Sequence, residues 1–155
     1  MGAVKLLVEG DMETAIFHHE KAIEICPSDT YHIARYAVLL CYLGEPERGL
    51  SEIERAMRID PFCSDLLFET QGLCFYLLNQ FESAIGSFKK MQIETRTSLF
   101  YQASCYKELG DTDNAKNFLN LGMTESGYTI EKFVSTQYFQ DEQLSFALNS
   151  SLSAI

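Results

Sequence analysis

One short phrase occurs four times along this 155-residue chain. Each copy begins with a glycine or an asparagine and has a small residue five positions later. Those small residues are Ala15, Gly49, Ala84 and Ala115, which lie 34, 35 and 31 positions apart. A period of this length with helical segments on both sides is typical of stacked helical repeats. Such arrays present an extended surface, so the repeat favours binding over catalysis.

The segments between the copies have the apolar spacing of amphipathic helices. Apolar residues recur every three or four positions in each run, as in Ile33, Ala37, Leu40 and in Leu50, Ile53, Ala56, Met57. Pro27 and Pro61 follow two of these runs, where a proline should end a helix. Each repeat is therefore expected to be a helix, a tight turn and a second helix.

The residues of the turns agree with this arrangement. Gly44, Gly110 and Asn79 can adopt the left-handed conformation that often ends a helix. Asp111 can cap the helix that follows it, and Pro46 suits a first helical turn. Small residues beside large apolar ones should let paired helices approach closely.

Composition and charge exclude several classes of function. An apolar content of 46% suits one compact domain, and the formal net charge of −10 disfavours nucleic acid as a partner. No stretch reaches the roughly 20 apolar residues that span a bilayer, so we expect no membrane insertion. The start of the sequence does not resemble a signal peptide. Five scattered cysteines without a Cys-x-x-Cys pair favour reduced thiols in the cytoplasm.

These features resemble the tetratricopeptide repeat, whose unit has small and large apolar residues at fixed positions and a terminal proline. One small position of the family corresponds to Ala22, Ala56, Met91 and Gly122, and one large position to His19, Ile53, Phe88 and Leu119. The resemblance implies an all-α superhelix of helix-turn-helix units in a single domain, residues 1–155. It implies a partial repeat at 1–29, repeats at 30–63, 64–95 and 96–123, and C-terminal capping helices at 124–155. Met91 and a shortened segment around Thr95 depart from the pattern.

The C-terminal segment resembles the end of bacterial class III adenylate and guanylate cyclases and related signalling proteins. The similar parts are residues 127–133, residues 138–141 and a helix with Leu144, Leu148 and Leu152. Gln140 stands where these proteins usually have lysine. The resemblance implies a regulatory or scaffolding C-terminal part of a larger signalling protein, with any catalytic domain outside this chain.

The tetratricopeptide resemblance also implies a binding surface for a protein or peptide, the concave face formed by the leading helix of each unit. The residues predicted to bind a partner are Tyr31, Val38, Tyr42, Leu66, Leu73, Tyr76, Phe100 and Lys107. Because most are aromatic or apolar, they favour an apolar or helical peptide. The alternative is that some of them pack against the next unit or against the C-terminal segment.

The sequence predicts no enzyme, metal site or cofactor. His18 and His19 are neighbours on a helix and point about 100° apart, which is unsuitable for joint chelation. No nucleophile–base signature is apparent, so an enzyme on a helical scaffold is the less favoured alternative. Another alternative is self-association. The half unit at the N-terminus, with Ala3, Leu6 and Leu7, predicts a homodimer through residues 1–25.

Overall fold

The computed structural model describes residues 12–124 and 128–155, and these residues form helices joined by short connections. The helices are α2 (Met12–Ile25), α3 (Thr30–Tyr42), α4 (Pro46–Ile59), α5 (Asp65–Leu77), α6 (Phe81–Phe88), α7 (Arg96–Glu108), α8 (Thr112–Gly122), α9 (Ile130–Val134) and α10 (Glu142–Ser153). The predicted all-α class is confirmed. The apolar residues Ala3, Leu6 and Leu7, on which the predicted dimer depends, lie outside the described residues.

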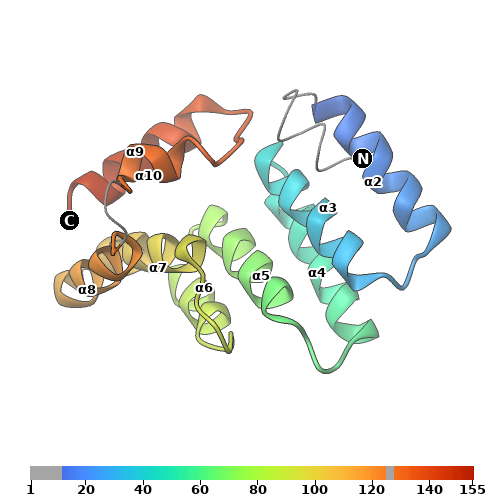
Figure 1. Ribbon diagram of the computed structural model, residues 1–155, viewed down its shortest axis with the longest axis horizontal. Coiled ribbons are helices and arrows are strands. Elements are labelled where there is room, and N and C mark those ends of the chain that lie inside the picture. The colour runs from blue at the N-terminus through green and yellow to red at the C-terminus, as the bar shows by residue number, and fades with distance from the viewer. Residues whose placement is uncertain (1–11, 125–127) are drawn as a thin grey trace.

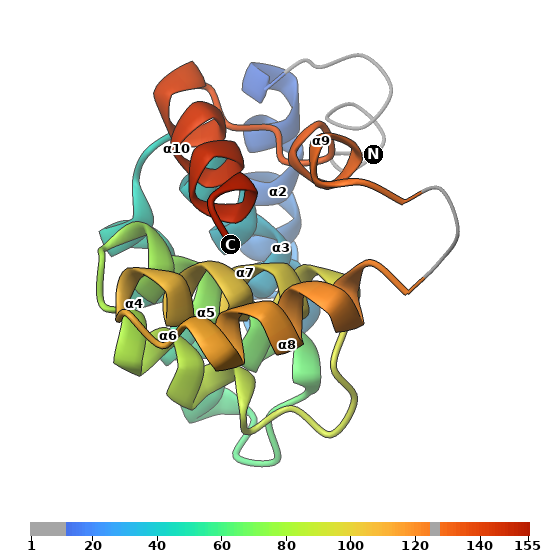
Figure 2. The ribbon, with the colours of Figure 1, turned by 90° about the vertical axis from the view of Figure 1, so that its left-hand side faces the viewer.

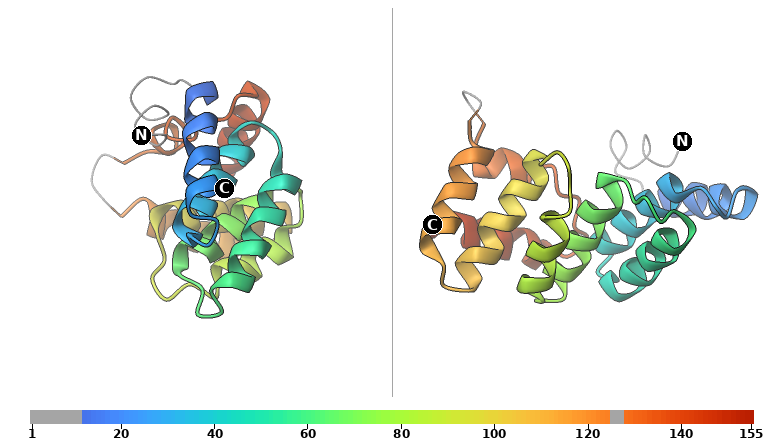
Figure 3. Two further views of the ribbon diagram at one scale, coloured as in Figure 1. Left: turned by 90° about the vertical axis from the view of Figure 1, so that its right-hand side faces the viewer. Right: turned by 90° about the horizontal axis from the view of Figure 1, so that it is seen from below.

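Three helix pairs stack side by side to form the array (Figures 1 and 3). The pairs are α3 with α4, α5 with α6, and α7 with α8, and α2 packs against α3. The leading helix α5 also contacts both α3 and α7. The three leading helices therefore form one continuous face. The tetratricopeptide resemblance predicts this face to be concave, and we call it the concave face.

Local chemistry ends each leading helix in the same way. Gly44, Asn79 and Gly110 have positive φ angles of 80°, 57° and 79°. In each case the next backbone N–H donates to a carbonyl five residues earlier, as from Glu45 to Leu40 at 2.9 Å. These are the left-handed helix endings that the sequence predicts. They reverse the chain, so the second helix of each pair packs back against the first.

The small residues lie where helices approach most closely. Gly72 on α5 faces the ring of Phe88 on α6, and a side chain at this position would overlap that ring. Gly49 on α4 faces Cys41 and Cys74, whose sulfurs would both lie 3.3 Å from a β-carbon there. These contacts set the spacing of the helices that carry the concave face.

The shortened segment before α7 is held by side chains of α5. Helix α6 has only eight residues and ends at Phe88. The Asp65 carboxylate accepts the backbone N–H groups of Gln92 and Ile93 at 2.8 and 3.0 Å. Thr95 then caps α7 and donates its hydroxyl to Glu69. Side-chain hydrogen bonds thus keep α7 in register where the repeat is irregular.

The C-terminal segment folds back onto the array, and we call residues 128–155 the tail. Figures 1 and 2 show α9 and α10 together beside α7. The Phe133 ring of α9 stacks on Phe100 of α7 with centroids 4.4 Å apart, and it meets Tyr101 edge-on at 5.6 Å. Phe139 packs edge-on against Tyr42 of α3 at 5.4 Å. The tail therefore contacts both the first and the last of the three leading helices, α3 and α7.

Replacing Gly72→Ala should destabilise the chain by about 1–3 kcal/mol, because the added methyl group forces the Phe88 ring and α6 away from α5. The free energy of unfolding in urea measures this. Gly86→Ala on the same pair of helices is the control, since its site is open to solvent. Alanine there should stabilise the helix by up to about 1 kcal/mol. Equal effects of the two substitutions would contradict the close contact.

Replacing Phe133→Ala should cost about 3–5 kcal/mol, because this ring is 1% exposed and fills the space between α9 and α7. Urea unfolding gives the free energy, and amide hydrogen exchange locates the loss in the tail. Phe146→Ala is the matched control within the tail, since Phe146 is 75% exposed and should change stability by less than about 0.5 kcal/mol. Unchanged exchange in the Phe133→Ala tail would show that the stacking does not anchor it.

Candidate functional site

A chain of hydroxyl groups joins the concave face to the tail. The Tyr76 hydroxyl lies 3.1 Å from the Ser104 hydroxyl, which lies 2.8 Å from that of Ser151 on α10. Ser151 in turn donates to Glu108 at 2.8 Å. Because an ionised carboxylate only accepts, donation runs from Tyr76 through Ser104 and Ser151 to Glu108. Burial raises the pKa of Tyr76 to about 12, which keeps its phenol protonated as the first donor.

Two further hydrogen bonds fix the turn between α9 and α10. The buried Tyr101 hydroxyl donates to Gln137 at 2.9 Å, and the backbone N–H of Gln140 donates to the Tyr42 carbonyl at 2.7 Å. Gln140 therefore contacts α3 through its backbone, so its side chain is not needed for this contact. The turn is thus tied to both α3 and α7. Two pockets lie among the residues predicted to bind a partner.

The first, the N-terminal pocket, lies between α3, α5 and the start of α7 and has a volume of about 120 Å³. Residues that line it include Arg35, Val38, Tyr42, Leu66, Glu69 and Leu73. Burial raises the pKa of Glu69, although its hydrogen bond with Thr95 acts in the opposite direction. The lining is mixed: Thr70, Thr97 and Gln137 add uncharged polar groups to the apolar side chains, and Arg35 and Glu69 supply opposite charges.

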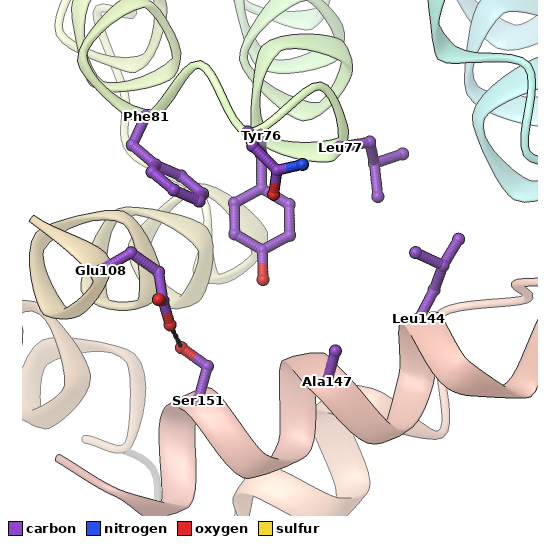
Figure 4. A pocket seen from close by; sticks show the side chains of 8 residues that line it. Tyr76, Leu77, Phe81, Glu108, Leu144, Ala147 and Ser151 are labelled. Atoms are coloured by element: carbon purple, nitrogen blue, oxygen red, sulfur yellow. Dashed lines mark hydrogen bonds between the residues drawn. The ribbon is translucent and has the colours of Figure 1, made fainter.

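The second, the tail pocket, lies between the array and α10 and has a volume of about 270 Å³ (Figure 4). Residues that line it include Tyr76, Leu77, Phe81, Glu108, Leu144 and Ala147. Lys107 donates to Glu108 at 2.9 Å. This hydrogen bond is the main reason why the pKa of Glu108 is lowered, and Ser151 adds to it. Glu108 is thus an ionised group at the end of an otherwise mostly apolar pocket.

The structure places the predicted partner-binding residues in different surroundings. Four of them line the N-terminal pocket, namely Val38, Tyr42, Leu66 and Leu73, and Tyr76 lines the tail pocket. Tyr31 is 60% exposed and Lys107 pairs with Glu108. Phe100, which is also predicted to bind a partner, is not accessible in the folded chain. It is fully buried because Phe133 and Gly122 pack against it, so it belongs to the core beneath the tail.

Sequence reasoning missed the contribution of the tail to the site. Glu108, Leu144 and Ala147 line a pocket with Tyr76, but two of them lie in the segment expected only to cap the array. The regular spacing of Leu144, Leu148 and Leu152 does indicate a helix with one buried face. That spacing contains no information on which surface of the array the helix covers.

One residue of the neighbouring histidine pair, His19, lies in the packed interior of the array. His19 is almost fully buried, and its Nδ1 has no hydrogen-bond partner in the part of the chain that the structure describes. Burial, followed by the nearby positive charge of Arg35, lowers the pKa of His19 to about 4. No group of three His, Cys, Asp or Glu side chains converges among residues 12–124 and 128–155. None of the described helices is both long and apolar enough to cross a membrane.

Comparisons with known proteins agree with this architecture. A family model described as "Tetratricopeptide repeat" matches residues 97–121, which include most of α7 and α8. The crystal structure of MamA is similar over 96% of this chain and 89% of that chain, with a TM-score of 0.65 and 14% sequence identity. At this identity the likeness concerns the fold. The chain thus contains a tetratricopeptide repeat at residues 97–121 and has a fold similar to that of MamA.

Proposed function

We propose that this chain is a protein-interaction module that binds a peptide segment of a partner in the N-terminal pocket. The observation that carries the proposal is the position of this pocket. It lies on the face formed by the leading helices, and one residue of the tail, Gln137, also lines it. Tetratricopeptide arrays with such faces are suited to extended binding surfaces.

The size and lining of the pocket favour a peptide over a small-molecule cofactor. Ligand pockets usually measure about 300–1,000 Å³, and the N-terminal pocket has about 120 Å³. That volume suits one or two anchoring side chains. Val38, Leu66 and Leu73 would contact apolar atoms of the peptide, and Arg35 would pair with an acidic or carbonyl group.

The wider context follows from the sequence resemblance of the tail. On that basis we propose that the module is the regulatory or scaffolding part of a larger bacterial signalling protein, such as an adenylate cyclase, and works in the cytoplasm. The N-terminal pocket would then contact another domain or a partner of that protein. A catalytic domain encoded upstream of residue 1 would support this context, and its absence from the complete gene would contradict it.

Photo-crosslinking in cells tests the binding site. A lysine analogue with a diazirine group is placed at position 97, at the N-terminal pocket, in place of Thr97. The matched control has the same analogue at Lys116, an exposed position on α8, the second helix of its pair. Adducts with a specific protein are expected from position 97 and not from position 116. Equal adducts from both positions, or none from position 97, would contradict the proposed site.

A further inference from the structure

We infer that the tail pocket binds one basic side chain, arginine or lysine, of a protein partner. This pocket is distinct from the N-terminal pocket, so the inference goes beyond the proposed peptide site and does not depend on it. It rests on the shape of the pocket, on one carboxylate oxygen that is left without a partner, and on the overall charge of the chain.

The walls of the pocket suit a long side chain with an apolar stem. Tyr76 and Phe81 line the side formed by the array, with ring centroids 6.0 Å apart. Leu144 and Ala147 of α10 line the opposite side, and Glu108 lies at one end (Figure 4). A chain of methylene groups would pack against Leu144 and Ala147 and bring a terminal charge toward Glu108.

The Glu108 carboxylate has capacity for one more donor. Its Oε1 accepts from Lys107 at 2.9 Å and from Ser151 at 2.8 Å. Among the residues that the structure describes, its Oε2 has no hydrogen-bond partner. The Tyr76–Ser104–Ser151 hydroxyl chain holds the carboxylate in place, so little order is lost when a ligand binds.

The chemistry of the pocket selects a cation. The faces of the Tyr76 and Phe81 rings attract positive charge, and a charge-assisted hydrogen bond to Oε2 adds to this attraction. A neutral side chain would remove water from Oε2 without replacing its hydrogen bonds, and an acidic one would be repelled. The formal net charge of −10 attracts basic partners over a longer range. Lys107 already neutralises part of the Glu108 charge, so it competes with the ligand.

An NMR titration of the full chain with a model peptide tests the inference. The probe is acetyl-Gly-Arg-Gly-amide, and its control contains citrulline, which has nearly the same shape without the charge. We expect affinity on the order of millimolar for a single anchoring side chain. Amide shifts should concentrate in residues 76–81 and 144–151. The citrulline peptide should bind at least about tenfold more weakly. Equal binding of both peptides, or shifts concentrated elsewhere, would overturn the inference.

Four variants separate the pocket from the general charge of the protein. Glu108→Gln keeps an Oε1 acceptor for Ser151 but removes the charge, so it should weaken binding about tenfold. Lys107→Gln should strengthen binding because it removes the competing cation. Ala147→Phe should block the pocket sterically. Glu54→Gln on α4 removes the same charge from an exposed position outside the pocket and should leave the affinity unchanged. Equal losses from Glu54→Gln and Glu108→Gln, or unchanged binding to Ala147→Phe, would overturn the inference.

Discussion

The close approach of helices at small residues is the constraint on which the rest of this structure depends. Gly72 allows the Phe88 ring to pack directly on the backbone of α5. Gly49 allows the sulfurs of Cys41 and Cys74 to pack closely against the backbone of α4. Helix α5 also contacts α3 and α7. The distance between α5 and α6 therefore affects the face that α3, α5 and α7 form together. Substitutions far from either pocket can therefore alter both of them, since packed interiors transmit displacement.

The tail gives this face its final form. Without it, Phe100, Tyr101 and Tyr42 would present aromatic surface to solvent, and in the folded chain Phe133 and Phe139 cover that surface. The aromatic residues at this end of the array thus contribute to folding. Two pockets border the tail: a small one of mixed charge that Gln137 also lines, and an acidic, aromatic one that α10 lines.

The repeat architecture could be predicted from the sequence because its signals are local. The helix endings at Gly44, Asn79 and Gly110 depend on residues within one turn. The site could be predicted only in part. An apolar residue is expected at position 100 both when a partner covers it and when the tail covers it. The residue type of Phe100 therefore does not distinguish the two cases. The tail pocket could not be predicted, because Glu108 meets Ser151 across 43 positions of sequence. Nothing in the spacing of the repeats relates these two residues.

Energetics favour binding in the two pockets over replacement of the tail by a partner. A segment that displaced the tail would have to compensate for the Phe133 stacking on Phe100, the Tyr101–Gln137 hydrogen bond and the hydroxyl chain that ends at Glu108. Each buried aromatic or polar contact of this kind contributes on the order of one to several kcal/mol. A ligand that enters the existing pockets loses none of these contacts and finds its polar groups already oriented. The tail therefore acts as a wall of the binding surface, and its stability should increase the affinity of both pockets.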